Sequence, residues 1–328
     1  MGGSGVRVLV TGAHGFIGSH LVEKLLAEGA SVRALVSPWG ELDNLAGVKD
    51  RLELVRADIS RAETLAGIFN GVELVYHAAA KVADYGPKSA FCQVNVEGTK
   101  NVLREAERAG VERLVLVSSV AVHRYSGFRD ADPRQRPRDG TINAYARSKV
   151  AAEDVLAGAD LETVIIRPGL WPFGPRDLNF RRVVGALRKG AFPLVDGGRA
   201  VLNTAYSENL VDGLWLAGTV PQAAGRTYAL ADAGAPSWAE VFTELARMLH
   251  VSAPRLSLPG ALTEPLGEAV EQAYGLLGTG SGPPLTRYRG ALMRRDVHFS
   301  TAAAERELGY TPRIGWQEGL ARTVATLP

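Results

Sequence analysis

Tyr145 and Lys149 are the residues of this 328-residue sequence whose types and spacing best suit proton transfer. Side chains four residues apart lie on the same face of a helix. A free tyrosine has a pKa of about 10, but a neighbouring ammonium group favours the phenolate and lowers that pKa. Such a pair can exchange a proton with a carbonyl or an alcohol. Because the same spacing occurs by chance in helices whose tyrosine merely packs, the interpretation depends on the rest of the chain.

A glycine-rich turn upstream predicts a dinucleotide site. Residues 6–10 are almost continuously apolar, as in a strand covered on both faces, and a helical pattern of apolar residues follows and ends before Gly29. Glycines between a strand and a helix let backbone N–H groups approach a pyrophosphate, and the helix N-terminus adds partial positive charge. We therefore assign cofactor binding to the following residues of this turn: Gly12, His14, Gly15, Phe16, Ile17 and Gly18.

Strands and helices alternate through the first half of the chain. The pattern predicts further strands at 31–36, 52–56, 72–77, 113–117 and 163–167, and helices at 95–109 and 143–156. Strands separated by helices indicate an α/β fold with a doubly wound parallel Rossmann sheet. We expect an NAD(P)-binding domain at 1–167. Beyond it we expect a smaller, mainly substrate-binding domain at 168–328, with segments around 200–232 returning to the first.

The composition excludes several classes of protein. Thirty-seven basic and 35 acidic residues leave a net charge of +2, too little to indicate a nucleic-acid partner. Cys92 is the only cysteine, which rules out an intrachain disulfide and a cysteine-based metal site. No run of about 18 apolar residues predicts a membrane span, no side chains have metal-ligand spacing, and residues 1–5 have no signal-peptide character. We expect a cytoplasmic protein that acts on a small molecule.

The end of the second predicted strand indicates which dinucleotide is used. An acidic residue there would bind the ribose 2′-hydroxyl of NAD and repel the 2′-phosphate of NADP. This chain has no acid at that point, and Ser37 can donate to either group while Arg33 is near in sequence. We therefore expect NADP, with NAD as the alternative. After the third strand, Asp58 and Ile59 are assigned to the adenine; alternatively, Asp58 caps a helix that starts near Ser60.

A run of small residues follows the strand at 72–77. We assign His77, Ala78 and Ala79 to the cofactor, because small residues permit a flat ring to come close, although an alanine run also starts helices easily. Lys81 and Tyr85 come next and are assigned to the substrate pocket.

The ordered set of motifs resembles the extended short-chain dehydrogenase/reductase superfamily, also described as the NAD-dependent epimerase/dehydratase family. The matching pieces are Thr11 to Gly18, Asp58, His77 to Ala80, Asn95 to Thr99, Ser118-Ser119, Tyr145-x-x-x-Lys149 and Arg167 to Trp171. Within it the chain looks most like the 3β-hydroxysteroid dehydrogenase and 2-alkyl-3-oxoalkanoate reductase branch. That likeness rests on the stretches 145–153, 166–177, 283–287 and 299–312.

The resemblance implies roles for individual residues. Ser119 would hydrogen-bond the substrate oxygen, Tyr145 would pass the proton, and Lys149 would hold the ribose and lower the pKa of the tyrosine. Pro168 would contact the cofactor. Ser118 is the alternative to Ser119. Asn95 would support a water near Lys149, or else cap a helix.

The chain departs from the family pattern at two points. Ser37 stands where the branch often has arginine or an acid, and Ser207-Glu208 stands where Val-Asp is usual. We expect a structural consequence from the second departure.

The second half is richer in proline and glycine and is less periodic. Trp171 and Phe173 are expected to line the pocket; otherwise they form a hydrophobic plug. Basic residues at 181–189 are either a phosphate clamp or a solvated helix face, and the arginine-rich loop at 124–139 is expected to be exposed and mobile. A leucine stripe from 258 to 277 predicts an amphipathic helix that packs on the protein body or covers an apolar substrate.

Three functions are compatible with these residues. The first is an NADP(H)-preferring oxidoreductase that interconverts a ketone and a secondary alcohol on a fairly apolar substrate such as a β-keto acid or a steroid-like ketone. The second is a sugar-nucleotide epimerase or dehydratase that retains NAD. The third is a non-catalytic dinucleotide sensor, which would need the glycine turn but not the tyrosine–lysine pair. A homodimer is a superfamily-level expectation.

Overall fold

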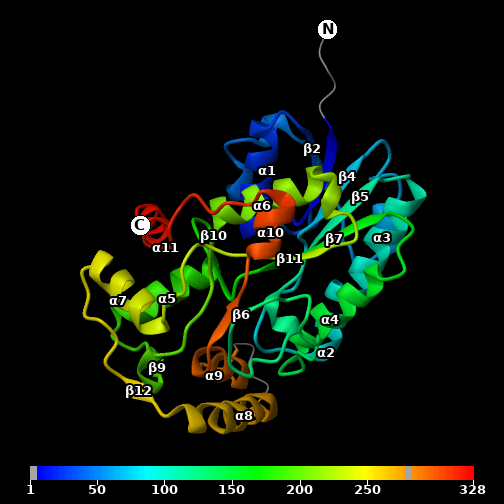
Figure 1. Cartoon of the computed structure of the whole chain (residues 1–328). Coiled ribbons are helices and arrows are strands. Elements are labelled where there is room, and N and C mark those ends of the chain that lie inside the picture. The colour runs from blue at the N-terminus through cyan, green and yellow to red at the C-terminus, as the bar shows by residue number, and fades with distance from the viewer. Residues whose placement is uncertain (1–5, 278–281) are drawn as a thin grey trace.

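A seven-stranded parallel sheet forms the centre of the protein, in the order β11-β7-β5-β4-β1-β2-β3 (Figure 1). The computed structural model describes residues 6–277 and 282–328, so residues 1–5 and the sequence expectation for them lie outside the described part. The strands are β1 (Arg7–Thr11), β2 (Ser31–Val36), β3 (Glu53–Arg56), β4 (Leu74–His77), β5 (Arg113–Val117), β7 (Glu162–Pro168) and β11 (Thr227–Leu230). This order confirms the α/β doubly wound Rossmann fold.

Helices cover both faces of this sheet, which is why its central strands are mostly apolar. In β5, Val115 and Val117 face a core shared with α1 (Phe16–Ala27) and α6 (Ser207–Thr219). Leu114 and Leu116 face the opposite core, shared with α3 (Gly98–Arg108) and α4 (Ala144–Leu156). The alternation follows from the two-residue period of a strand.

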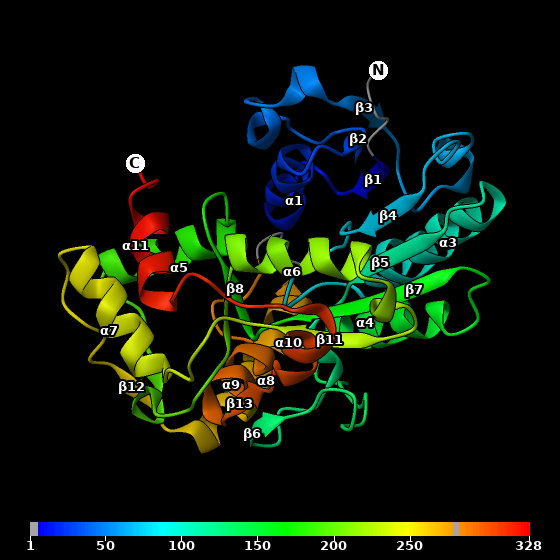
Figure 2. The same ribbon diagram turned by 45° about the horizontal axis from the view of Figure 1, so that its top comes forward.

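The second half of the chain adds helices and three small parallel sheets beside the large one. In Figures 1 and 2 α5, α7 and α11 lie on the left of the view and α3 lies on the right. The helices are α5 (Leu178–Arg188), α7 (Trp238–Met248), α8 (Gly260–Leu277), α9 (Arg287–Arg294), α10 (Ala302–Leu308) and α11 (Trp316–Val324). The strand pairs are β8 (Trp171–Phe173) with β10 (Thr204–Tyr206), β9 (Leu194–Val195) with β12 (Ser257–Leu258), and β6 (Phe128–Ala131) with β13 (Val297–Phe299).

Residues from the second half also complete the large sheet. Strand β11 pairs with β7, and α6 packs beside α1 against the same face. A division into domains near residue 167, with the segment around 200–232 returning to the first, remains our proposal.

The segment predicted as a helix at 95–109 begins earlier than expected. It consists of α2 (Lys88–Phe91), a π-helical stretch (Cys92–Glu97) and then α3. The π-helical stretch carries Asn95, so this residue does not cap a helix as one interpretation had it. Short π-helical segments often occur next to functional sites.

The arginine-rich loop at 124–139 is exposed along much of its length, but it is tied to the C-terminal part of the chain. Its strand β6 pairs with β13, and Arg129 and Arg134 form ion pairs of 2.8 Å each with Asp296 and Glu307. These contacts were not foreseen from the sequence, because their partners lie more than 160 residues away.

The leucine stripe of α8 does not pack on the protein body as predicted. Leu262 and Leu266 are 59% and 48% exposed, and the helix instead turns Thr263 and Gly267 towards α9. A Cβ atom at Gly267 would lie 2.5 Å from the backbone of Thr286. The helices therefore approach so closely that only small residues fit between them, and the leucines are left outside.

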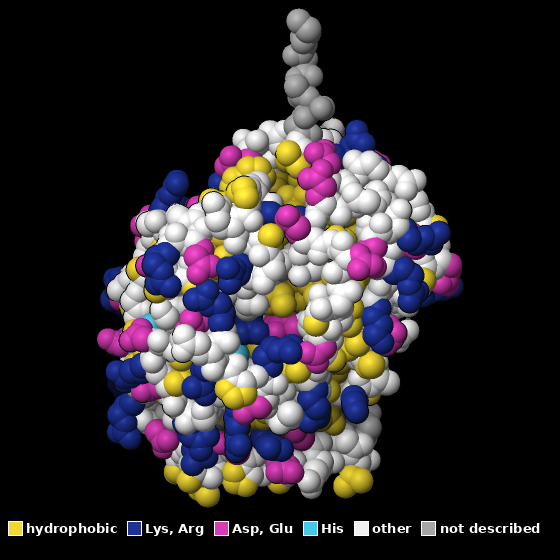
Figure 3. All heavy atoms as spheres, turned by 45° about the vertical axis from the view of Figure 1, so that its right-hand side comes forward, with side chains coloured by type: hydrophobic (Ala, Val, Ile, Leu, Met, Phe, Trp, Pro, Cys, Tyr) yellow, Lys and Arg dark blue, Asp and Glu magenta, His cyan; other side chains and the backbone are white. Residues whose placement is uncertain are grey.

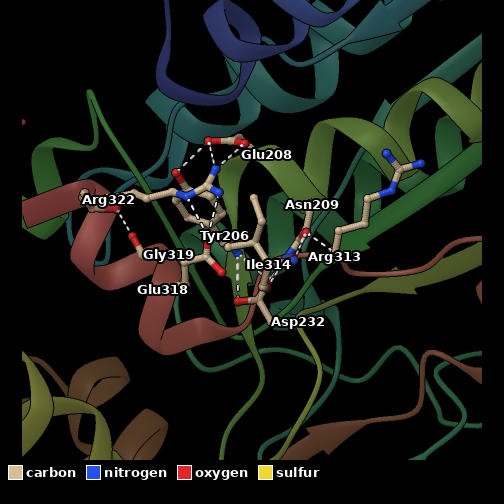
Figure 4. Close-up of polar contacts among 10 residues, drawn as sticks. Tyr206, Glu208, Asn209, Asp232, Arg313, Ile314, Glu318, Gly319 and Arg322 are labelled. Atoms are coloured by element: carbon tan, nitrogen blue, oxygen red, sulfur yellow. Dashed lines mark hydrogen bonds and ion pairs between the residues drawn. The ribbon is translucent and has the colours of Figure 1, made fainter.

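The C-terminal segment is fastened to the sheet by a buried cluster of polar residues that we call the C-terminal clamp: Thr204, Tyr206, Asn209, Asp232 and the backbone of 313–314 (Figure 4). Asp232 accepts hydrogen bonds from the Thr204 hydroxyl at 2.8 Å, from the Tyr206 backbone and from the Asn209 amide. Asn209 in turn donates to the Ile314 carbonyl at 2.7 Å.

The unusual pair Ser207-Glu208 lies beside this clamp. Glu208 accepts a hydrogen bond from the Tyr206 hydroxyl at 2.9 Å and forms an ion pair with Arg322 of α11. Ser207 is buried against Gly174. Both residues therefore have the structural role that we expected.

The surface mixes both signs of charge. Basic side chains crowd the lower half of the face drawn in Figure 3, with acidic side chains among them. Within residues 6–277 and 282–328, no helix is long and apolar enough to cross a membrane. In the same part of the chain, no group of three or more His, Cys, Asp or Glu side chains is arranged to hold a metal ion.

Candidate active site

Helix α4 places Tyr145 and Lys149 on one buried face at the end of β5. The helix begins at Asn143, whose side chain accepts a hydrogen bond from the Ala146 N–H at 2.8 Å. Tyr145 is 9% exposed and Lys149 is 3% exposed. The ammonium group of Lys149 donates to the carbonyl oxygen of Val117 at 2.8 Å, which fixes it against the last residue of β5.

Burial dominates the electrostatics of this pair. It lowers the pKa of Lys149 from 10.5 to about 8, while the negative charge of Glu153 acts in the opposite direction. Burial raises the pKa of Tyr145, and a hydrogen bond with Ser119 lowers it in part. In the protein alone, the tyrosine is therefore a protonated acid. The sequence argument, in which lysine lowers the pKa of the tyrosine, did not include this desolvation.

The two serines at the end of β5 have different surroundings. Ser119 has an extended backbone, and its hydroxyl accepts from the Ala121 N–H at 3.1 Å on the side of Tyr145. Ser118 donates its hydroxyl hydrogen to Glu153 at 2.5 Å. Only Ser119 thus stands beside the phenol, whereas Ser118 belongs to a buried network behind α4.

That network was missed in the sequence. Arg167 donates two hydrogen bonds to the Glu153 carboxylate, at 2.6 and 2.9 Å, and lies 3.0 Å from a ring nitrogen of His123. Burial and the charge of Arg167 lower the pKa of His123 to about 4, so this histidine is neutral at physiological pH. The sequence signal was a charged residue at the end of an apolar strand, together with Glu153 one helical turn after Lys149.

Asn95 connects α4 to the loop after β4. Its side-chain oxygen accepts from the Lys81 N–H at 2.7 Å, and its amide donates to the Lys81 carbonyl and to the Ser148 hydroxyl at 2.8 Å. These bonds fix the backbone at Lys81 relative to the helix that carries Tyr145.

The glycine turn has the close backbone approach that a dinucleotide cradle requires. Gly12 has a φ of +69°, and a Cβ atom there would lie 2.8 Å from the Cα atom of Ala79. A Cβ atom at Gly18 would collide with the carbonyl oxygen of Gly12. Gly15 precedes α1 without any side-chain cap, and no acidic residue lies in the first turn, where Phe16 and Ile17 stand. The N-terminus of α1 therefore has the geometry and charge to hold a pyrophosphate.

Arg56, which sequence reasoning did not select, lies beside the segment expected to read the adenosine ribose. Its guanidinium donates to the carbonyl oxygens of Ser37, Pro38 and Gly40 at 3.0–3.1 Å. Arg33, which was expected there, instead lies 2.8 Å from Glu53 and reaches the loop at 68–70. The difference follows from the register of β2 with β3: Arg33 pairs with Glu53, whereas Arg56 pairs with Val36 at the end of β2.

His14 lies between the glycine turn and Ser37. Its Nε2 atom is 3.4 Å from the Ser37 hydroxyl, and its buried Nδ1 atom has no partner among the described residues. Burial and the charge of Arg56 lower its pKa. The neutral ring thus has one free polar atom within the expected cofactor site.

The residues assigned to the adenine and to the flat ring of the cofactor are largely occupied by structural contacts. Asp58 accepts from both the N–H and the hydroxyl of Ser60, at 3.0 and 2.8 Å, in a turn before the 3-10 helix Ala62–Leu65, which it does not cap. Ile59 is buried against Gly98. The ring nitrogens of His77 lie 2.7 and 3.0 Å from the hydroxyls of Thr11 and Thr99, and burial lowers its pKa to about 3. The His77 side chain is therefore a structural group.

Ala78, Ala79 and Pro168 remain as backbone positions near the cradle. Ala78 and Ala79 form the wall that a side chain at Gly12 would strike. Pro168 ends β7 and pairs with Leu230.

Besides Ser119, which lies beside the Tyr145 phenol, four residues were assigned to the substrate pocket, and they separate into two groups. The ammonium group of Lys81 lies 5.5 Å from the ring centre of Phe91, which itself packs edge-on to Tyr145. The hydroxyl of Tyr85 donates to a backbone carbonyl of α8 at 3.3 Å. Lys81 therefore lies on the side of Tyr145, whereas Tyr85 contacts α8.

Trp171 and Phe173 do not line the pocket as predicted. Phe173 is fully buried, and Trp171 is stacked on it at 5.3 Å and on Phe180 at 6.0 Å. They belong to an aromatic core with Trp238 and Phe242, which corresponds to the hydrophobic plug. Large aromatic side chains after a buried strand suit either position, so their type alone could not distinguish the two.

Comparisons with known proteins agree with this geometry. The model of the NAD dependent epimerase/dehydratase family matches residues 8–231. A 2-alkyl-3-oxoalkanoate reductase of Stenotrophomonas maltophilia is 30% identical, over 98% of this chain and 99% of its own. A 3 beta-hydroxysteroid dehydrogenase/Delta 5-->4-isomerase of Mycobacterium tuberculosis is 30% identical, over 96% of this chain and 88% of its own.

Two solved structures are similar over the whole chain. The crystal structure of gox2253 superposes with a TM-score of 0.80 at 28% identity and covers 97% of both chains. A UDP-glucose 4-epimerase of Thermotoga maritima superposes with a TM-score of 0.76 and covers 98% of both chains, but at 19% identity it shows the fold alone.

Proposed function

Because this chain belongs to the NAD dependent epimerase/dehydratase family of extended short-chain dehydrogenases/reductases, we propose that it interconverts a ketone and a secondary alcohol on a fairly apolar substrate, with NADP(H) as the preferred cofactor. Membership makes the chain an NAD(P)-dependent enzyme. The substrate, the cofactor preference and the residue roles are the proposal.

The observation that carries the proposal is the position of Tyr145 and Lys149 on one buried face of α4, with Ser119 beside the phenol. In reduction, Tyr145 would give its phenolic proton to the substrate oxygen, and in oxidation it would take that proton back. Ser119 would hold the same oxygen by a hydrogen bond. Lys149, with its lowered pKa, would stabilise the phenolate that forms.

The chain's own residues also suit the cofactor. Gly12, Gly15 and Gly18 with the N-terminus of α1 would hold the pyrophosphate, and Lys149 would hold the nicotinamide ribose. When bound, the nicotinamide supplies the hydride for the carbonyl carbon. Burial of Tyr145 and Lys149 excludes water from the place where the proton moves.

The preference for NADP(H) rests on charge at the end of β2. The residue directly after Val36 is Ser37, which offers a hydroxyl and no negative charge. Arg56 lies beside it, with a guanidinium group that donates to carbonyl oxygens alone in the described part of the chain. A guanidinium at this point favours a 2′-phosphate over a hydroxyl.

The preference for an apolar substrate rests on the relatives and on the pocket side. The relatives' names specify an alkyl oxoalkanoate and a hydroxysteroid. Phe91 and Tyr125 lie in the same apolar core as Tyr145. For a sugar nucleotide, the arginines of α5 would have to clamp phosphates, but Arg181 and Arg182 are exposed on the outer face of that helix.

A substrate panel tests the proposal. Purified protein would be given NADPH or NADH with an apolar β-keto acid or ester, a ketosteroid, and a UDP-sugar, and absorbance of the reduced nicotinamide would be followed. We expect turnover of an apolar ketone and faster turnover with NADPH. Turnover of the UDP-sugar alone, with NAD retained through purification, would reject the proposal in favour of an epimerase. Equal or faster turnover with NADH would reject the cofactor preference.

We further propose that the protein works in the cytoplasm. Its single cysteine, Cys92, is exposed and cannot form an intrachain disulfide, which suits a reducing compartment.

A further inference from the structure

A buried tyrosine, Tyr125, and a partly buried one, Tyr288, form a hydrogen-bonded pair beside the residues assigned to catalysis. Tyr125 follows β5, and Tyr288 lies in α9, far along the sequence. Their hydroxyl oxygens are 3.2 Å apart, and their ring centres are 6.0 Å apart. Tyr125 is 5% exposed and belongs to the apolar core that contains Tyr145.

Asp84 connects the helix that carries Tyr288 to the helix that carries Tyr145. Its backbone carbonyl accepts from the side chain of Asn143 at 3.1 Å, and its carboxylate accepts from the hydroxyl of Thr286 at 3.2 Å. Asn143 caps α4 and Thr286 caps α9. Tyr145 and Tyr288 each come two residues after these caps, so both lie in first turns that are fastened to the same point.

The electrostatics agree with this proximity. Burial raises the pKa of both Tyr125 and Tyr288, and a negative charge on Tyr145 adds to the increase at each. Both phenols are therefore protonated donors whenever Tyr145 works.

The hydrogen-bond count of the pair leaves one donor unused. Each phenol carries one O–H, and a bond between two phenols uses only one of the two hydrogens. Neither hydroxyl has another partner in the described part of the chain. Tyr85, the residue after Asp84, differs because its hydroxyl already donates to the Glu271 carbonyl. The second O–H of this partly buried pair is therefore free to donate to a ligand atom.

We propose that the free O–H of the Tyr125–Tyr288 pair donates a hydrogen bond to a second oxygen of the substrate, close to the carbonyl that Tyr145 protonates. The inference rests on the proposed function and narrows it. The preferred substrate is a ketone with a second oxygen acceptor nearby, as in a 3-oxo acid or 3-oxo ester, and a ketone without one binds more weakly. Tyr125 and Tyr288 are then specificity-determining residues, because they touch the substrate but transfer no proton.

Two ligands of equal shape test this directly. Ethyl 3-oxohexanoate has the second carbonyl, and 4-nonanone replaces the ester group by methylenes. Binding of each to the protein saturated with NADP+ is measured by isothermal titration calorimetry, which does not require turnover. The variant is Tyr125→Phe with Tyr288→Phe, because removing both hydroxyls leaves no unpaired buried group. Tyr310→Phe is the matched control, because it removes one buried hydroxyl, which donates to the Ala231 carbonyl at 2.9 Å.

For wild-type protein we expect the oxo ester to bind about 5- to 20-fold more tightly than 4-nonanone, as for one hydrogen bond in a buried site. In the double variant this ratio should fall to about one, through weaker binding of the ester alone, while Tyr310→Phe keeps the wild-type ratio.

Three results would overturn the proposal. These are a wild-type protein that does not prefer the ester, a double variant that keeps the preference, and a double variant in which both ligands weaken equally. The last would mean that the two rings only form a wall. If the wild-type preference is present and the double variant loses it, but neither compound is reduced with NADPH, the donor pair stands and the proposed reaction is rejected.

Discussion

Two buried polar regions of this protein differ in how fully their hydrogen bonds are satisfied. In the C-terminal clamp, Asp232 accepts from three neutral groups, and Asn209 uses both its oxygen and its amide on the sheet and on the C-terminal segment. In the catalytic region, Lys149 has three N–H groups but donates to one carbonyl oxygen in the described part of the chain.

The clamp therefore has a structural role, whereas the region around Lys149 has groups left to bind a ligand. A saturated network fixes one geometry and has nothing left to offer a ligand. A buried ammonium group with unused donors is costly unless another molecule completes it. The same holds for the unused hydroxyl hydrogen of the Tyr125–Tyr288 pair and for the free Nδ1 atom of His14. All of these lie on the side of the sheet's carboxyl ends, where ligands of such folds bind.

The largest effect is expected from the substitution Lys149→Met. If Lys149 is costly to the fold and needed for the reaction, the variant should lose about 10²- to 10⁴-fold in kcat. At neutral pH it should also unfold at a higher temperature than the wild type. Kinetics with saturating NADPH and thermal unfolding of the unliganded proteins measure the two effects. A variant that loses stability would make Lys149 a structural residue.

The pH dependence of stability tests independently whether Lys149 destabilises the folded protein. The pKa of Lys149 falls from 10.5 in the unfolded chain to about 8 in the folded protein. Between these values the unfolded chain binds more protons, so the lysine's contribution to wild-type stability rises with pH. The Tm advantage of Lys149→Met should therefore shrink from about pH 8 upwards. A difference that stays constant up to pH 10.5 would contradict the assignment.

The opposite outcome is expected in the clamp. Asn209→Ala removes four hydrogen bonds and leaves the Asp232 carboxylate and the Ile314 carbonyl short of donors. The free energy of unfolding should fall by about 2–4 kcal/mol in denaturant titrations, with kcat of the folded protein unchanged. Arg322→Ala is the control, since its ion pair with Glu208 is exposed and should matter much less. A stable Asn209→Ala protein with reduced kcat would invert the comparison.

The same two regions differ in how well they could be predicted from the sequence. Tyr145, Lys149 and the glycine turn could be predicted because their partners lie within one helix or one turn. The Asp232 and Glu153 networks could not, since each joins residues far apart in the chain whose types are common on surfaces. Trp171 and Phe173 were misplaced because an aromatic side chain serves a core and a pocket equally well.

The neighbouring residues Ser118 and Ser119 allow the same contrast, between an effect on stability and an effect on kcat, to be tested within one turn. Ser119→Ala should lower kcat by about 10²-fold, as for loss of one donor to the reacting oxygen, with little change in stability. Ser118→Ala should keep most of kcat and lose about 1–2 kcal/mol, because its hydroxyl bonds the buried Glu153 carboxylate. Steady-state kinetics and denaturation of both variants decide it. If the two effects are exchanged, Ser118 is the catalytic hydroxyl.

The smallest effect is expected at the cofactor. Arg56→Gln should raise KM for NADPH by about 10-fold and leave KM for NADH nearly unchanged, because only the 2′-phosphate needs the guanidinium. Arg33→Gln is the matched control, since that side chain faces Glu53 and should leave the KM ratio as it is. An equal change for both cofactors in Arg56→Gln would show that Arg56 only shapes the loop.

The central claim is that Tyr145 transfers the proton, and Tyr145→Phe tests it most directly. The variant would be compared with Tyr228→Phe, whose buried ring belongs to the core shared with α1 and α6 and whose hydroxyl donates to Glu307. Cofactor affinity is measured by titration and kcat by consumption of NADPH with the best ketone of the panel. We predict that Tyr145→Phe binds NADPH like the wild type and loses at least about 10²-fold in kcat, while Tyr228→Phe keeps its kcat. Wild-type turnover by Tyr145→Phe would contradict the account.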